Sequence, residues 1–186
     1  MRDPKNNLVK AWSRDYNEKP FFFGQNFPNG SRLIAWSEES NMNKDVFYKI
    51  LESMSSNLSV IVKISAGRNE REEIIWTIYQ GNPQKEIVHK VIRDNEKYVF
   101  SDGMHQFWIK DTKTGRYLVF EDHGVFNLYF PNASDEALLL SAGFEKRFGD
   151  PIFSAPHFHC TENSSEEAEM KFVSELGLTM TNPGSD

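Results

Sequence analysis

The chain divides into segments whose hydrophobic residues follow a strand pattern and segments whose hydrophobic residues follow a helical one. Residues 57–65, NLSVIVKIS, are β-branched and almost unbroken, which predicts a central strand. Apolar runs of strand length predict further strands, namely RLIAW (32–36), EEIIWTIYQ (72–80), QFWIK (106–110), GRYLVFE (115–121) and VFNLYF (125–130). Short links that contain Gly115 and Gly124 join the last three, so we expect these three to pair as a meander.

Three segments have the features of helices. Hydrophobic residues over 42–54 recur on one stripe, which predicts a helix that Asn41 or Asn43 can cap. The capping sequence Ser-Asp-Glu at 134–136 predicts a second helix. The third covers SSEEAEMKFVSELGL (164–178), which opens with two serines able to cap it and has acids in its first turn.

One segment, KEIVHKVIR (85–93), fits both patterns. Its apolar residues have a spacing that suits a helix, while its β-branched content and the turn Gly-Asn-Pro before it suit a strand. We favour the strand.

Together these elements predict a single α+β domain over residues 32–178. It would be a curved antiparallel sheet, a meander in part, packed with two to four helices, and the length of 186 residues fits one such domain. Residues 1–31 are rich in Asn, Pro and Gly and predict an irregular arm, and residues 179–186 predict a flexible tail. The phenylalanines at 21–27 should fold back onto the domain, with a partner surface as the alternative.

The composition of the chain indicates in which cellular compartment the protein is expected. The chain has one cysteine, Cys160, which excludes an internal disulfide and agrees with a reducing compartment. It has no uncharged apolar run long enough to cross a bilayer, and its first 20 residues lack the apolar core of a signal peptide. We therefore expect a cytoplasmic protein that does not associate with a membrane.

The net charge of −6 is concentrated at the end of the chain. Residues 161–186 hold six acids and one base, so the other 160 residues have a net charge of only −1. Aromatic and basic residues that could stack nucleic-acid bases on a sheet are interleaved at Phe107, Trp108, Lys110, Arg116 and Tyr117. Nearby acids and the lack of a basic cluster argue against a nucleic-acid partner and leave room for a cationic protein partner.

The stretch FEDHGVFNLYF (120–130) holds polar groups that suit either an active site or a turn. Between two predicted strands, Asp122 offers turn hydrogen bonds and Gly124 can take a left-handed backbone conformation. This leaves His123 and Glu121 unexplained, and catalysis by that pair would need a nucleophile or a metal nearby. We interpret the stretch as a hairpin connection, and we predict no catalytic residue and no cofactor.

The alternative hypothesis is a small metal-dependent enzyme that uses His157 and His159 in APHFHC (155–160). Two residues apart on an extended strand, both imidazoles would point to one side, where they could hold zinc. A third ligand would have to come from Glu162, His123 or His105. The spacing matches neither HExxH nor paired CxxC motifs, so the metal site is the weaker hypothesis.

In its architecture the chain resembles the bacterial immunity proteins that neutralise contact-dependent or polymorphic toxins. The resemblance covers the acidic α+β body from about residue 32 to residue 178 and implies a non-enzymatic function. It also implies a protein partner, a basic toxin domain that an acidic face would attract and cover. By charge and aromatic character, the residues we expect at this partner interface are Tyr117, Glu121, Asp122, Phe126, Glu166, Glu167 and Glu169.

Metal analysis of the purified protein separates the two hypotheses. The enzyme hypothesis predicts one zinc ion per chain, which substitution of His157 and His159 by alanine would release. The binding hypothesis predicts no stoichiometric zinc. The measurement is zinc content by mass spectrometry after dialysis, with the double variant as the control.

Overall fold

The computed structural model describes residues 19–37, 40–68, 74–101, 105–121, 125–148 and 165–181. The strands are β1 (Phe21–Phe27), β2 (Gly30–Trp36), β3 (Leu58–Arg68), β4 (Ile74–Gly81), β5 (His105–Asp111), β6 (Tyr117–Phe120), β7 (Val125–Tyr129), β8 (Glu145–Lys146) and β9 (Thr179–Thr181). The helices are α2 (Ser40–Glu52), α3 (Lys85–Asp94), α4 (Glu96–Ser101), α5 (Ala133–Ser141) and α6 (Glu166–Glu175).

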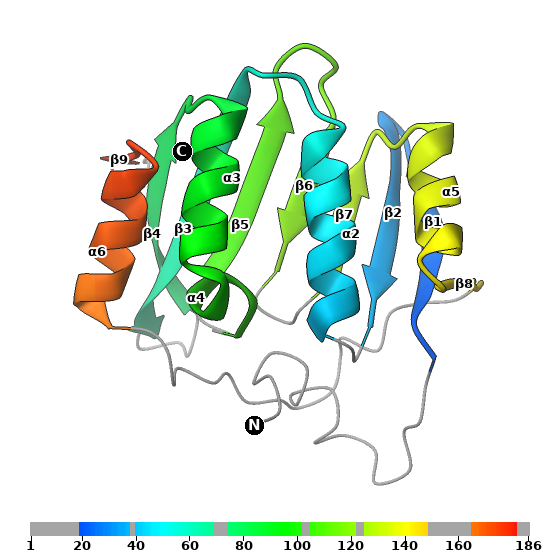
Figure 1. The fold of residues 1–186 in the computed structure, drawn as a ribbon, viewed down its shortest axis with the longest axis horizontal. Coiled ribbons are helices and arrows are strands. Elements are labelled where there is room, and N and C mark those ends of the chain that lie inside the picture. The colour runs from blue at the N-terminus through cyan, green and yellow to red at the C-terminus, as the bar shows by residue number, and fades with distance from the viewer. Residues whose placement is uncertain are drawn as a thin grey trace, which may run out of the picture.

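All nine strands form one open sheet, and the five helices pack against one face of it (Figure 1). The strand order is β8-β1-β2-β7-β6-β5-β3-β4-β9, and every neighbouring pair is antiparallel except β1 with β8. The predicted single α+β domain with a mostly antiparallel sheet is therefore confirmed. None of the helices in the described ranges is long and apolar enough to cross a membrane.

The meander of β5, β6 and β7 is confirmed by its register. Lys110 pairs with Tyr117, and Tyr117 pairs with Tyr129. The Glu121 N–H donates to the carbonyl of Val125 at 3.0 Å, which brings together the two ends of the connection predicted at 122–124. Residues 122–124 themselves lie outside the described ranges.

The strand predicted at 85–93 is wrong, because this segment forms the helix α3. Val88, Val91 and Ile92 are buried on one stripe of it, so they pack against the sheet as a helical face would. Tertiary packing of that stripe outweighs the small helix penalty of β-branched residues. With α4 directly after it, the described helices number five, one more than the upper limit expected.

The predicted irregular arm is wrong for residues 21–30. β1 pairs with β2 along its whole length, from Phe21 with Trp36 to Phe27 with Gly30. The strand alternation buries Phe22 toward the helices and sends Phe23 to the opposite face, which is why this run of phenylalanines is compatible with a soluble fold. At the other end, residues 179–181 of the predicted tail form β9 against β4.

The main core lies between the sheet and the helices, and Phe47 of α2 is at its centre. Its ring centroid lies 5.3 to 6.5 Å from those of four other buried rings, Phe100, Phe107, Phe120 and Phe126. Burial of each such ring contributes about 2 kcal/mol relative to exposure. This cluster fixes α2 across the middle of the sheet.

The helix ends agree with the sequence in two cases and differ in two. The cap of α5 predicted at 134–136 is wrong, because Asn132 caps this helix and its side chain accepts a hydrogen bond from the N–H of Asp135. Ser165 caps α6 and accepts a hydrogen bond from the N–H of Ala168, as predicted. The sequence also predicts that the helix α5 stops at Gly143, and Gly143 follows α5 with a φ of +91°. The predicted caps of α2 are wrong, because the helix begins at Ser40 and Asn43 lies inside it, where its side chain donates to the carbonyl of Ser37.

The turn between β5 and β6 depends on the buried carboxylate of Asp111. It accepts hydrogen bonds from the Ser55 hydroxyl at 2.5 Å, the Ser55 N–H at 3.0 Å and the Lys113 N–H at 2.9 Å. Burial alone would raise the pKa of Asp111, but these hydrogen bonds outweigh burial and hold that pKa well below its ordinary value. The ionised carboxylate thus ties α2 to the meander.

Substitution of Asp111 by Asn should lower the free energy of unfolding at pH 7 by about 1–3 kcal/mol. Because the pKa is depressed in the folded state, the carboxylate stabilises the fold above its unfolded pKa of about 4 and loses this effect as the pH falls further. The wild-type protein should therefore lose more stability than Asp111→Asn between pH 5 and pH 2 in urea unfolding. Asp45→Asn, at an exposed position on α2, is the control. Equal pH slopes for the wild type and Asp111→Asn would contradict the assignment.

Candidate binding surface

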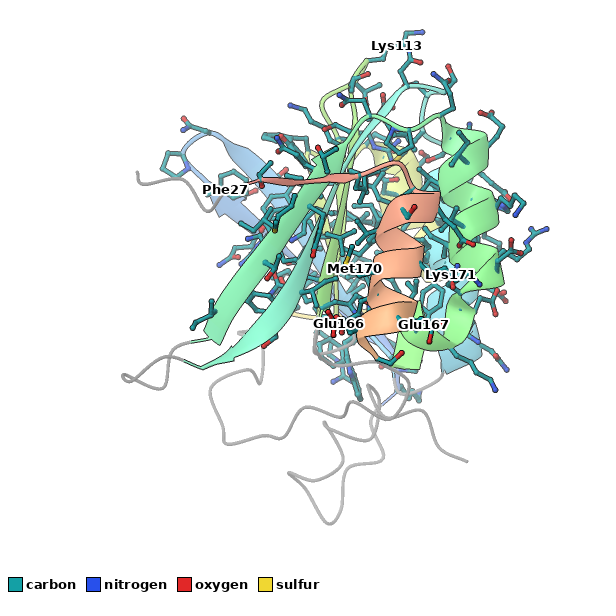
Figure 2. The ribbon with its side chains drawn as sticks, turned by 90° about the vertical axis from the view of Figure 1, so that its left-hand side faces the viewer. Phe27, Lys113, Glu166, Glu167, Met170 and Lys171 are labelled. Carbon is teal, nitrogen blue, oxygen red and sulfur yellow. The ribbon has the colours of Figure 1, made fainter. Side chains whose placement is uncertain are left out.

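The candidate site is part of the face of the sheet away from the helices, next to a buried cluster of Phe23, Ile34, Trp36 and Val125 on the same face. No described helix covers it, as the edge-on view shows (Figure 2). The alternation of β5 shows how the two faces differ, because Phe107 and Ile109 are buried toward the helices while Trp108 and Lys110 are half-exposed on the other side. Large aromatic and cationic side chains thus lie on a rigid surface.

Cross-strand pairing brings six of these side chains together. Arg32 of β2 pairs with Tyr129 of β7, Tyr129 with Tyr117 of β6, and Tyr117 with Lys110 of β5. Trp108 lies two residues from Lys110 on β5, and Lys63 is on the adjacent strand β3. We call these six residues the aromatic–cation surface: Arg32, Lys63, Trp108, Lys110, Tyr117 and Tyr129.

The three rings of this surface contact one another. The rings of Trp108 and Tyr129 are nearly parallel, with centroids 6.5 Å apart and an interplanar angle of 16°. Tyr117 meets Tyr129 edge to face at 6.4 Å. Phe130, which is 42% exposed, extends the aromatic area toward Phe27 at the tip of the β1–β2 hairpin.

Each ring is also contacted by a cation. The Lys63 Nζ lies 4.9 Å from the centroid of Trp108, and the Lys110 Nζ lies 5.0 Å from that of Tyr117. The guanidinium carbon of Arg32 is 5.6 Å from the centroid of Tyr129. Such contacts contribute about 0.5–1 kcal/mol each at exposed sites and hold the charged groups close to the surface.

Arg32 is oriented by hydrogen bonds as well. Its Nε donates to Gln25 Oε1 at 2.8 Å, and one Nη donates to Tyr129 Oη at 2.9 Å and to Asn127 Oδ1 at 3.2 Å. The amide of Asn127 in turn donates to Glu121 Oε1 at 2.7 Å. The polar groups of β1, β2, β7 and the end of β6 therefore form one network.

The residues predicted at a partner interface are placed differently by the structure. Tyr117 belongs to the aromatic–cation surface, and Glu121 lies beside it on the same face. The prediction of Phe126 as a surface anchor is wrong, because Phe126 is 0% exposed and faces Phe47 in the core. Strand alternation is the reason, since the neighbours of Phe126 along β7 point to the other face. Asp122 lies outside the described residues.

The acids of α6 lie on the helix side of the sheet (Figure 2). Glu166 and Glu167 are exposed in its first turn, and Glu169 is partly exposed. Glu121 and the α6 acids therefore lie on opposite sides of the sheet, because the alternation of β6 directs Glu121 to the other face. The two groups of acids cannot contact one flat partner surface together.

The residues of the metal hypothesis remain largely outside the described part of the chain. His123, His157, His159 and Glu162 all lie outside it. His105 is buried on β5 and stacks on Tyr98 with ring centroids 4.5 Å apart. In the described ranges, no three His, Cys, Asp or Glu side chains are grouped as metal ligands.

Sequence reasoning found half of the aromatic–cation surface. The interleaved set it considered holds five residues, of which Trp108, Lys110 and Tyr117 belong to the surface. Phe107 is in the core, and Arg116 is buried in an ion pair with Asp135. Arg32, Lys63 and Tyr129 were missed, although the strand alternation contained the signal for the face to which each points.

Comparisons with known proteins give no further guide to this surface. No protein family model matches the chain, and no curated protein or solved structure matches it significantly.

Proposed function

We propose that the chain is a non-enzymatic protein-binding domain that contacts its partner through the aromatic–cation surface. The observation that carries the proposal is the arrangement of three half-exposed rings, Trp108, Tyr117 and Tyr129, each in contact with a cation. Trp, Tyr and Arg are the residues that most often contribute large binding energies at protein interfaces. Their placement on paired strands means that little side-chain freedom is lost on binding.

The shape of the surface supports a macromolecular partner over a small molecule. The three rings lie on the neighbouring strands β7, β6 and β5, with Arg32 on the next strand, β2, on the face of an open sheet. Small-molecule sites are concave and enclose most of their ligand. A broad set of rings with polar groups at its margin has the composition of a protein interface.

Our second proposal, also of a protein-binding function, is that the chain is an immunity protein that neutralises a toxin. The carboxylates of α6 support it. Glu166 and Glu167 are exposed at the start of the helix, and no described residue forms an ion pair with either. Met170, 48% exposed, lies one turn further along the same helix. Two unpaired acids beside an apolar side chain would attract and then contact a cationic toxin domain.

Photo-crosslinking tests the binding surface. Benzoylphenylalanine in place of Trp108 should give a specific covalent adduct with a protein partner in the cells that produce this chain, because the position is at the centre of the surface. The same group in place of Ile87, which is 44% exposed on α3, is the matched control and should give little adduct. Adducts identified by mass spectrometry in equal yield from both positions would contradict the proposal.

The immunity role is tested by protection against the toxin encoded by a neighbouring gene. Glu166, Glu167 and Glu169 substituted by Lys should weaken binding at low salt by about tenfold or more, because steering and contact charges are both reversed. The control variant changes three exposed acids elsewhere, Asp45, Glu52 and Glu86, to Lys with the same change in net charge. Equal protection by both variants would exclude α6 as the toxin-binding element.

A further inference from the structure

We propose that the aromatic–cation surface binds an extended protein segment that carries carboxylates spaced about four residues apart. This inference rests on the proposed function and names the chemistry of the partner. The proposed ligand follows from the sign of the charge on the surface, from the hydrogen-bond donors of its cations and from the distance between those cations.

The surface has the opposite charge to the chain as a whole. Among the described side chains of β1 to β7 that point away from the helices, the charged groups are Arg32, Lys63, Lys110 and Glu121. These are three cations and one carboxylate, a net charge of +2, while the whole chain has a net charge of −6. An anionic partner is complementary in charge to this face.

The cations of the surface have donors left for a carboxylate. Within the described residues, neither Lys63 nor Lys110 forms an ion pair, and each is held against a ring. The hydrogen bonds of Arg32 use its Nε and one Nη, which leaves both hydrogens of the other Nη without a described acceptor. Arg32 is therefore oriented in advance for a charge-assisted hydrogen bond.

The spacing of the cations sets the spacing of the acids. Arg32 and Lys110 are the two ends of a cross-strand row in which Tyr129 and Tyr117 lie between them. Three strand spacings separate these ends, which is about 14 Å. An extended chain covers about 13 Å in four residues. Because its side chains alternate between two sides, the residue midway between two such acids points to the same side as the acids. That middle residue would contact the tyrosine rings.

Single-stranded nucleic acid is the competing ligand, since it also uses rings and cations. Binding along a phosphate backbone needs a continuous basic groove, whereas this surface holds three cations on a chain of net charge −6. The charge balance favours a peptide with a few carboxylates over a polymer with one charge per nucleotide.

The test is a titration of the full ¹⁵N-labelled protein, followed by the NMR signal of the Trp108 indole. The probe is a ten-residue peptide with Glu at positions 2, 6 and 10, Leu at positions 4 and 8, and Ser elsewhere. We expect the Trp108 indole signal to shift on titration, and the shift to diminish as the salt concentration rises. The same peptide with Lys in place of Glu should leave the signal unchanged.

Variants identify the cations. Lys63→Gln with Lys110→Gln should weaken binding about tenfold at low salt, while Lys63→Arg with Lys110→Arg should retain it. Lys49→Gln with Lys97→Gln, on the helix side, is the matched control and should bind like the wild type. The NMR spectrum of each variant also reports whether it is folded.

Three results would overturn the inference: no shift with the Glu peptide, equal binding of the Lys peptide, or tighter lysine-dependent binding of a ten-nucleotide oligouridylate. Its failure is distinguishable from failure of the proposed function. If position 108 still crosslinks to a protein while the Glu peptide does not shift the indole signal, the surface binds proteins but not through spaced acids.

Discussion

The structure depends on the alternation of side chains along its strands, because all the helices in the described ranges pack on one face of the sheet. Every strand therefore contributes to two environments at once. On β5, Phe107 and Ile109 are buried against the helices, so Trp108 and Lys110, which alternate with them, lie on the opposite face. The composition of the binding surface follows from this constraint, since any residue between two core residues must lie on that face.

The main core is built from aromatic rings on the helix side of the sheet. Phe47, Phe100, Phe107, Phe120 and Phe126 contact one another between α2, α4 and the meander. Trp108, Tyr117 and Tyr129 do not belong to this cluster. Large rings that are partly exposed outside the core, of residue types that often contribute binding energy, are candidates for an interaction surface.

The two charged regions lie on opposite sides of the sheet and have opposite signs. The acids of α6 are on the helix side, and Arg32, Lys63 and Lys110 are on the other. The two surfaces would therefore suit partners of opposite charge, a cationic one at α6 and an anionic one at the aromatic–cation surface.

The sequence by itself determined the elements whose signals are local. The β-branched strand β3, the meander and the start of α6 at Ser165 follow from residue patterns within a few positions. The sequence was ambiguous about the structure of the segment that forms α3, because a short apolar run fits a helix and a strand equally well until packing selects one. Only the tertiary structure decided that Phe126 is buried and that Arg32 meets Asn127, 95 residues away. Such contacts depend on strand order, which arises from the packing of the whole sheet and has no local signal in the chain.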